Sequence, residues 1–289
     1  MHACGHDTHT AILLGVAKIL KEVEDKLKVR VKLIFQPCEE AAPSGGRLMC
    51  EAGVMDDVDE ILTTHTSVVN PTGTVRLGKA CMNASCHTFL ITVHGKSAHV
   101  SNPQGGVDAI AVANKIYMCI QEMRAREIAP GEPVIVGIGS IHGGTAPNII
   151  CDTVQMEGTV RATTQRTEDH CKKRIESICA ACAEMSDATV DIHWNELIPS
   201  VWNNPDIAQK IIDIASEQLG AENVLPQGLN MGSEDFAFFV QEKPGARFMY
   251  GATKPGEQPT KGHNPNFMVD ENAFPVPARI LAQYVLESE

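Results

Sequence analysis

The sequence predicts an α/β fold that is interrupted by a smaller α+β segment, and two observations support this prediction. First, helical and strand patterns alternate through residues 1–81 and again through 196–289, as in an α/β sheet with flanking helices. Second, residues 82–195 follow the order strand, helix, strand, strand, helix, strand, which is the split-βαβ pattern of ferredoxin-like domains. We therefore expect 1–81 and 196–289 to form one domain and 82–195 to form an inserted second domain.

Within the two outer ranges, apolar periodicity indicates the individual elements. Apolar residues at helical spacing, from Ile12 to Leu20, predict a helix over 9–24. The apolar run VRVKLIFQP predicts a buried strand over 29–37 that ends at Pro37. The other patterns predict a short helix after Gly45-Gly46, a strand at 59–65 ending at His65, helices at 205–219 and near 234–241, a strand at 246–251 and a final helix from near residue 271.

The inserted segment, residues 82–195, has clearer apolar periodicity than the outer ranges. CHTFLITVHG alternates as a strand does, and GVDAIAVANKIYMCIQEMRAR is an amphipathic helix pattern. VIVGIGSIHGG and TVQMEGTVRAT follow as two strands. EDHCKKRIESICAACAEM then predicts a second helix, and ATVDIHW closes the segment as a strand. This order is compact enough for a domain of its own.

Composition and charge exclude several classes of function and location. The chain has 36 acidic and 24 basic residues, a net charge of −12, so we expect neither nucleic acid nor anionic lipid as a partner. No apolar run approaches the roughly 18 residues of a membrane span. The start MHACGHDTHT lacks the basic and apolar regions of a secretory signal. We therefore expect a cytoplasmic protein.

The ten cysteines fall well below the density of a disulfide scaffold. A reducing compartment and mostly buried, inert thiols are the better interpretation. Cys179 and Cys182 form a CxxC inside a helical pattern. That spacing is open to a redox or zinc pair, but a packed helix face is favoured.

Potential metal ligands gather at segment ends, where α/β folds place their sites. Each signal is weak alone, because a single histidine or a pair of glutamates is usually an ordinary surface feature. Their combination of thiolate, imidazole and carboxylate suits zinc or another late first-row divalent ion. The residues concerned are Cys4, His6, Glu39, Glu40, His65 and His263.

A family resemblance accounts for this set. HACGHDTHTAILLG, QPCEEA followed by GG, the strand-terminal His65, HGKSAHVSNPQGGVDAI, GGTAPNII, GTVRAT, MGSEDFAFF and GHNPNF occur in the order used by M20 metallopeptidases. The sequence most resembles the amidohydrolase branch, which includes N-acyl-amino-acid, hippurate and indoleacetyl-amino-acid hydrolases. The resemblance covers essentially the whole chain. It implies a zinc-peptidase-like catalytic domain, a mixed sheet with flanking helices, interrupted by a ferredoxin-like lid and dimerisation domain.

Carried over by position, the resemblance implies a site for two divalent metal ions, with Zn, Mn, Co and Ni all suited to its ligands. It makes Glu39 the general base that acts on a metal-activated water. A carboxylate bound to a metal accepts protons poorly, so one glutamate of the pair can bind while the other stays free. Asp7 either orients a ligand or caps the nearby helix. The implied metal ligands are Cys4, His6, Glu40, His65 and His263.

The resemblance also assigns roles within the insert. His99 matches a histidine that reaches into the partner subunit's site to stabilise the oxyanion, which implies a homodimer formed through the lid domain. Asn148 and Arg161 match lid residues that hold the substrate's carbonyl and carboxylate. Without the family pattern, these three residues would be interpreted as an exposed loop residue, a turn residue and a surface salt bridge.

The leading hypothesis is therefore a metal-dependent amidohydrolase that cleaves the amide bond of N-acyl amino acids or small peptide-like substrates. A second hypothesis makes Cys4 a nucleophile with His6 or His9 as its base, but it leaves Glu39, Glu40 and His263 unexplained.

The third hypothesis is a truncated, inactive or weakly active relative that keeps the dimerisation domain and a vestigial metal site. It arises because family members carry a further segment before HACGHD, which holds the first strands of the catalytic sheet. On this view we expect the chain as given to expose a sheet edge and to be prone to aggregation.

Overall fold

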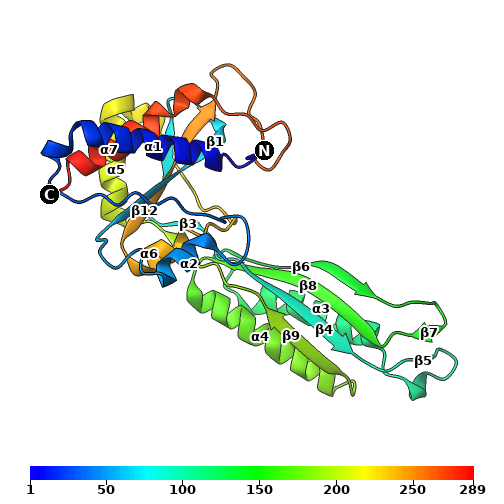
Figure 1. Ribbon diagram of the computed structural model, residues 1–289. Helices are drawn as coiled ribbons and strands as arrows, with labels where there is room; N and C mark the ends of the chain where they lie inside the picture. The colour runs from blue at the N-terminus through cyan, green and yellow to red at the C-terminus, as the bar shows by residue number, and fades with distance from the viewer. The chain divides into compact units, whose positions relative to one another are not determined.

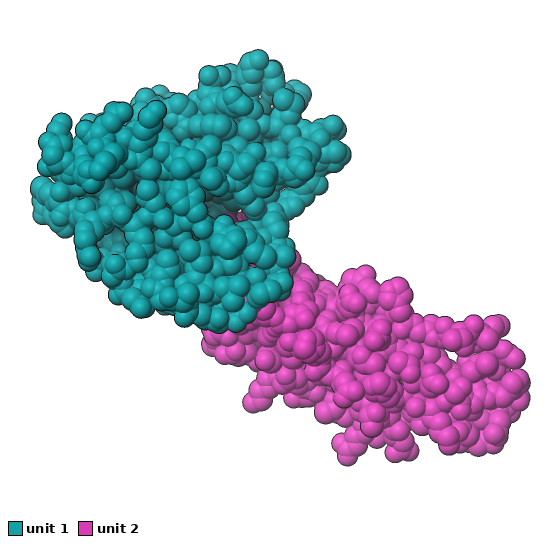
Figure 2. Space-filling view, in the orientation of Figure 1, with its two compact units in different colours: residues 1–82, 201–229, 235–289 teal, residues 83–200, 230–234 magenta.

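The computed structural model describes residues 1–289, which divide into two compact units (Figures 1 and 2). Unit 1 comprises residues 1–82, 201–229 and 235–289, and unit 2 comprises residues 83–200 and 230–234. Both units combine sheets with helices, so the α/β class expected from the sequence is confirmed. None of the helices has the length and apolar character needed to traverse a bilayer.

Unit 1 is built on a four-stranded mixed sheet. Its long strands β1 (Ile61–Pro71) and β12 (Gly245–Thr253) are parallel, and His65 lies opposite Met249. Phe248 and Tyr250 are alternate residues of β12 and therefore face the same side of the sheet. The sheet is completed by β2 (Val75–Leu77) and β11 (Val224–Pro226), in the order β1-β12-β2-β11.

Three helices cover the face of β12 that bears these aromatic side chains: α1 (His6–Glu22), α5 (Pro205–Leu219) and α7 (Pro275–Leu286). Phe248 packs in one cluster with apolar residues of α5 and α7. Tyr250 packs in the next cluster with apolar residues of α1 and α7. The apolar stripe that predicted a helix near the N-terminus is therefore the stripe that α1 buries. The smaller elements of unit 1 are η1 (Glu24–Lys26), α2 (Gly45–Glu51), β3 (Cys81–Asn83), β10 (Val201–Trp202), η3 (Ala221–Asn223), α6 (Ala237–Glu242) and η4 (Glu271–Ala273).

Unit 2 has the predicted split-βαβ order. Its antiparallel sheet has the strand order β6-β8-β4-β9, and a single core joins the sheet to two helices. Phe89, Ile91 and Val93 alternate along β4 and are all buried. The main elements are β4 (His87–His94), α3 (Ala109–Glu127), β6 (Val134–Gly143), β8 (Thr153–Ala162), α4 (Gln165–Glu184) and β9 (Thr189–Trp194), and the short ones are β5 (Ala98–His99), η2 (Pro103–Gly105) and β7 (Ile149–Ile150).

Two sequence predictions about strands are wrong. Residues 29–37 form no strand, and the side chains of Val31 and Phe35 are 37% and 46% exposed. An apolar run becomes a strand only beside a partner's backbone donors and acceptors, and no strand of this chain pairs with it. In addition, β1 does not end at His65 but continues to Pro71, with a register shift after Ser67.

The CxxC in α4 belongs to the core of unit 2. Cys179 and Cys182 are buried, and no disulfide forms anywhere in the chain. Burial raises the pKa of the Cys179 thiol to about 12 and also raises the pKa of Cys182. Because the thiolate is the reactive form, these cysteines are poor nucleophiles and metal ligands at neutral pH. The structure thus favours the packed helix face over the redox or zinc pair.

Candidate metal centre

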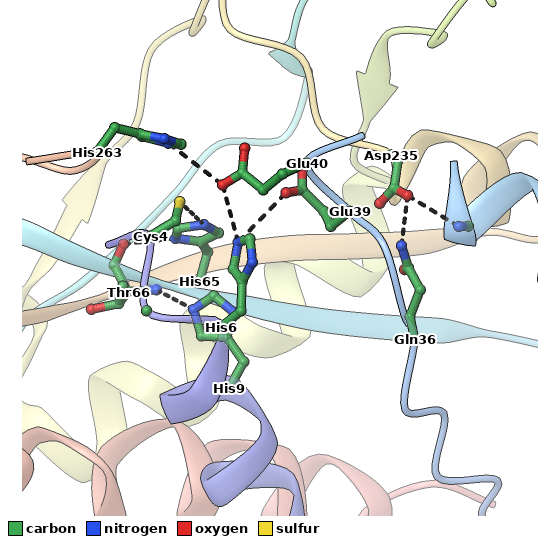
Figure 3. A network of polar contacts seen from close by, with 12 residues as sticks. Cys4, His6, His9, Gln36, Glu39, Glu40, His65, Thr66, Asp235 and His263 are labelled. Atoms are coloured by element: carbon green, nitrogen blue, oxygen red, sulfur yellow. Dashed lines mark hydrogen bonds and ion pairs between the residues drawn. The ribbon is translucent and has the colours of Figure 1, made fainter. Parts of the chain in front are cut away.

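The site begins at a left-handed turn that precedes α1. Gly5 has φ +81°, a conformation that other residues adopt only with strain, and it is buried. A Cβ atom at Gly5 would lie 2.6 Å from Cγ2 of Thr66, so the turn packs directly on β1. This turn brings Cys4 and His6, on either side of the glycine, to the same group of polar side chains (Figure 3).

His65 enters this group from β1 in the form that binds a metal. Its Nε2 lies 3.5 Å from Sγ of Cys4, and its Nδ1 lies 2.8 Å from the Thr66 carbonyl oxygen. A carbonyl can only accept, so Nδ1 carries the hydrogen and Nε2 keeps its lone pair. Burial, followed by the positive charge of Arg247, lowers the pKa of His65 to about 3. The imidazole is therefore neutral at physiological pH.

The two glutamates reach the group from the loop that follows residues 29–37. His6 Nε2 lies 3.5 Å from Oε2 of Glu39 and 3.9 Å from Oε1 of Glu40. His263 Nε2 lies 3.6 Å from that same Oε1 of Glu40. The loop bearing His263 is tied to the N-terminal segment, because its amide donates to the Ala3 carbonyl at 2.7 Å. All six side chains that the sequence singled out as candidate ligands therefore converge (Figure 3).

The donor set fits divalent metal ions. Ligand atoms of Cys4, His6 and His65 lie within 4.8 Å of one another, and so do those of Cys4, Glu40 and His263. Cys4 is thus common to two groups of three donors. Donors about 2.0–2.3 Å from a tetrahedral zinc are about 3.3–3.8 Å apart, close to the spacings between the observed pairs. Thiolate, neutral imidazole and carboxylate are also the ligand types of late first-row metals.

The remaining predicted residues lie in unit 2. His99 is exposed on β5, and its Nδ1 lies 2.7 Å from Oγ of Ser101. Asn148 is exposed just before β7, and its carbonyl accepts from the amide of Val100 at 3.1 Å. These two residues are therefore neighbours on the β5–β7 pair.

Arg161 lies apart from that pair. It is half-buried near the end of β8, where its guanidinium donates to the Met231 carbonyl at 3.0 Å. Strand β8 starts at Thr153, shortly after β7, and its length from Thr153 to Arg161 is roughly 27 Å at about 3.4 Å per residue. The structure thus brings His99 and Asn148 together but does not bring either to Arg161.

Two open alternatives can be compared with these contacts. The Asp7 carboxylate accepts from the amide of the next residue, Thr8, at 3.0 Å, but the N-cap of α1 is Gly5 and no side chain caps this helix, so the capping alternative is not supported. Cys4 contacts the imidazole of His65, a residue that the cysteine-nucleophile hypothesis did not use as a base.

Sequence reasoning gave no place in the metal site to two residues that border it. His9 Nε2 accepts from the Thr66 amide at 3.0 Å, and its ring centroid lies 4.5 Å from that of His65. His9 is the first residue of the helix predicted over 9–24 and lies three residues after His6, and this spacing was the available signal. Asp235 is buried beside the glutamate loop. It belongs to the motif MGSEDFAFF, to which the sequence analysis assigned no role.

Comparison with known proteins shows which family the chain belongs to. The model of peptidase family M20/M25/M40 matches residues 1–287, so the chain belongs to this family. Thermostable carboxypeptidase 1 of Saccharolobus solfataricus is 36% identical over 281 residues, covering 95% of this chain and 70% of that protein. IAA-amino acid hydrolase ILR1-like 4 of Arabidopsis thaliana is 36% identical over 296 residues, covering 99% and 67%.

A solved structure shows the same fold at similar identity. The Bacillus subtilis YXEP protein, described as a dinuclear metal binding peptidase from the M20 family, superposes with a TM-score of 0.82 at 30% identity. The match covers 99% of this chain and 72% of that one. The chain is therefore a hydrolase of a family that uses divalent metal ions.

The turn at Gly5 leads to a stability prediction with an internal control. Gly5→Ala places a Cβ against Thr66 and forces alanine into the left-handed region, so it should destabilise the fold by about 2 kcal/mol or more. Gly15→Ala, inside α1 where no atom lies within 4 Å of the new Cβ, should stabilise by about 0.5–1 kcal/mol. Urea denaturation of both variants measures the difference. Equal stabilities would show that the turn is not constrained.

Proposed function

We propose that this chain is a metal-dependent amidohydrolase that hydrolyses the amide bond of N-acyl amino acids or small peptide-like substrates. The observation that carries the proposal is the convergence of Cys4, the histidines and the glutamate pair at one place in unit 1. The names of two relatives, an IAA-amino acid hydrolase and a carboxypeptidase, support this substrate class.

The proposed ligands hold two divalent ions, and the sharing of Cys4 between two donor groups supports that number. The description of the Bacillus subtilis relative as dinuclear supports it too. Zn, Mn, Co and Ni all suit such ligands. When bound, the ions supply Lewis acidity that polarises the scissile carbonyl and makes water a better nucleophile. The ligands in this proposal are Cys4, His6, Glu40, His65 and His263.

Glu39 is the proposed general base. The Oε1 of Glu40 lies between two imidazoles, those of His6 and His263, which suits a ligand. Glu39 contacts the imidazole of His6 through Oε2, and 28% of its side chain is exposed. In this role its carboxylate takes a proton from the attacking water and passes it to the nitrogen of the leaving amine. The same group thus completes both proton transfers of one turnover.

The two glutamates can be separated by substitution. Glu39→Gln should keep the metal but lower kcat by about 10²–10⁴-fold, because an amide cannot accept the proton. Glu40→Gln should instead lower metal affinity, since it removes a charged ligand. Metal content and turnover of N-acyl amino acids are measured on both variants. Loss of metal from Glu39→Gln with retention in Glu40→Gln would mean that the two roles are reversed.

We also propose a homodimer formed through unit 2, which acts as the lid and dimerisation domain. Its edge strand β6 has no Asp, Glu, Lys or Arg, and Ile135 and Ile141 are 39% and 51% exposed. Sheet edges in monomers are usually protected by charge, so this edge suits pairing with a second copy. The opposite edge, β9, carries Asp191.

The positions of three residues in unit 2 support a site in which each substrate is bound by residues of both subunits. Arg161 is proposed to bind the substrate carboxylate with its planar fork of donors, while Asn148 binds the carbonyl. Arg161 lies near the end of β8, whereas Asn148 precedes β7 and lies beside β5, which supports contacts to the substrate from different subunits. His99 lies with Asn148, so both are proposed to act on the partner's site. There His99 donates to the oxyanion as negative charge develops.

Activity of mixed dimers tests this arrangement. His99→Ala should keep its fold and metal but lose about 10²–10³-fold in turnover. His193→Ala, which also removes an exposed imidazole from unit 2, should leave turnover unchanged. Mixing His99→Ala with Glu39→Gln should partly restore activity, because one site of the heterodimer then has both groups. If subunits exchange and no activity returns, His99 does not act in trans.

The alternative function is an inactive or weakly active relative with a vestigial metal site. Assay of the 289-residue chain distinguishes the two, because a vestigial site gives little or no turnover of N-acyl amino acids. The location is proposed to be the cytoplasm, which is supported by the ten cysteines without a disulfide among them.

A further inference from the structure

A single buried carboxylate contacts both ends of the loop that bears the glutamates. Asp235 is 1% exposed and lies just before α6. Its Oδ2 accepts from Nε2 of Gln36 at 2.6 Å (Figure 3). The same oxygen accepts from Oγ of Ser44 at 2.7 Å and from the amide of Gly46 at 3.0 Å. One donor therefore precedes Glu39 by three residues, and the other two follow Glu40.

The loop between these donors has little else to hold it. Residues 37–43 are exposed except for the half-buried Glu39, so no apolar core fixes their conformation. Cys38 also has φ +55°, in the left-handed region that is unfavourable for a residue with a side chain. The loop is closed by the amide of Gly45, which donates to the Cys38 carbonyl at 3.1 Å. A strained, exposed loop keeps one conformation only when its ends are fixed.

Asp235 packs closely enough to fix those ends. A Cβ at Gly46 would lie 2.7 Å from the Asp235 carbonyl oxygen, so the start of α2 directly abuts this residue. The carboxylate oxygens of Glu39 and Asp235 lie within 4.8 Å of each other. Three donors on one ionised oxygen are charge-assisted hydrogen bonds, which are stronger than neutral ones.

We propose that Asp235 is a positioning residue that holds Glu39 and Glu40 in place by fastening both ends of their loop. This inference rests on the proposed function for the roles of the two glutamates. In this proposal Asp235 is not one of the metal ligands and does not bind the substrate. Its effect passes through the loop, so it should influence proton transfer through Glu39 and metal binding through Glu40 together.

The test substitutes Asp235→Asn in the full chain. An amide oxygen can replace only part of the carboxylate's acceptor capacity, and the new NH₂ group faces existing donors. Hydrogen exchange of the amides in 37–46 should accelerate, and affinity for added Zn²⁺ should fall by about 10–100-fold. At saturating metal, kcat should remain about 10–100-fold low with little change in KM, because no substrate contact is lost.

Asp270→Asn is the matched control. Asp270 also lies in unit 1 and accepts from Thr72 Oγ1 at 2.7 Å and from the Asn272 amide at 3.1 Å, with no contact to the glutamate loop. It should leave exchange in 37–46, Zn²⁺ affinity and kcat unchanged. If Asp235→Asn does not fold, Gln36→Leu removes one donor at the loop's first end and should give the same changes at smaller size.

A second comparison separates positioning from a general structural role. In a Glu39→Gln background, Asp235→Asn should lower the residual kcat no further, while it should still lower Zn²⁺ affinity. Unchanged exchange and Zn²⁺ affinity in Asp235→Asn would overturn the inference, as would an equal loss of kcat in both backgrounds. A third outcome would refute only the proposed function. In that outcome Asp235→Asn exchanges faster and binds Zn²⁺ more weakly, but the wild-type chain hydrolyses no N-acyl amino acid.

Discussion

The thiol of Cys4 is shared by two groups of candidate metal ligands in unit 1, and the geometry of the site depends on it. It lies within ligand distance of two different sets of donors, one with His6 and His65 and one with Glu40 and His263. These donors come from separate segments, so each segment must pass through the same place. Carboxylate and imidazole groups that lie this close together suit a divalent cation, because one cation binds several donors at once.

Different local contacts hold these segments at the site. The turn at Gly5 packs on Thr66 and so couples the start of α1 to the strand that bears His65. The loop of His263 is tied by its own amide to Ala3. The glutamate loop is tied at both ends to Asp235. Movement of any one of these connections would separate donors that must act together.

The sequence was most informative where the signal is local. Periodicity located α5 and the six main elements of unit 2, because burial of one face imposes its period on the residues. It failed for 29–37, since an apolar run does not reveal whether a partner strand lies beside it. The family motifs indicated which donors group together, but not how they are held. Gln36 and Asp235 are 199 residues apart in the chain, and neither spacing nor composition links them.

Metal content measures the central claim most directly. The purified chain and His263→Ala are dialysed against an excess of Zn²⁺, Mn²⁺, Co²⁺ and Ni²⁺ and then against metal-free buffer, and bound metal is determined by elemental analysis. The account predicts about two ions per wild-type chain and clearly fewer in the variant, with unit 2 still folded. A wild-type chain that retains no metal, or a variant that retains as much as wild type, would contradict it.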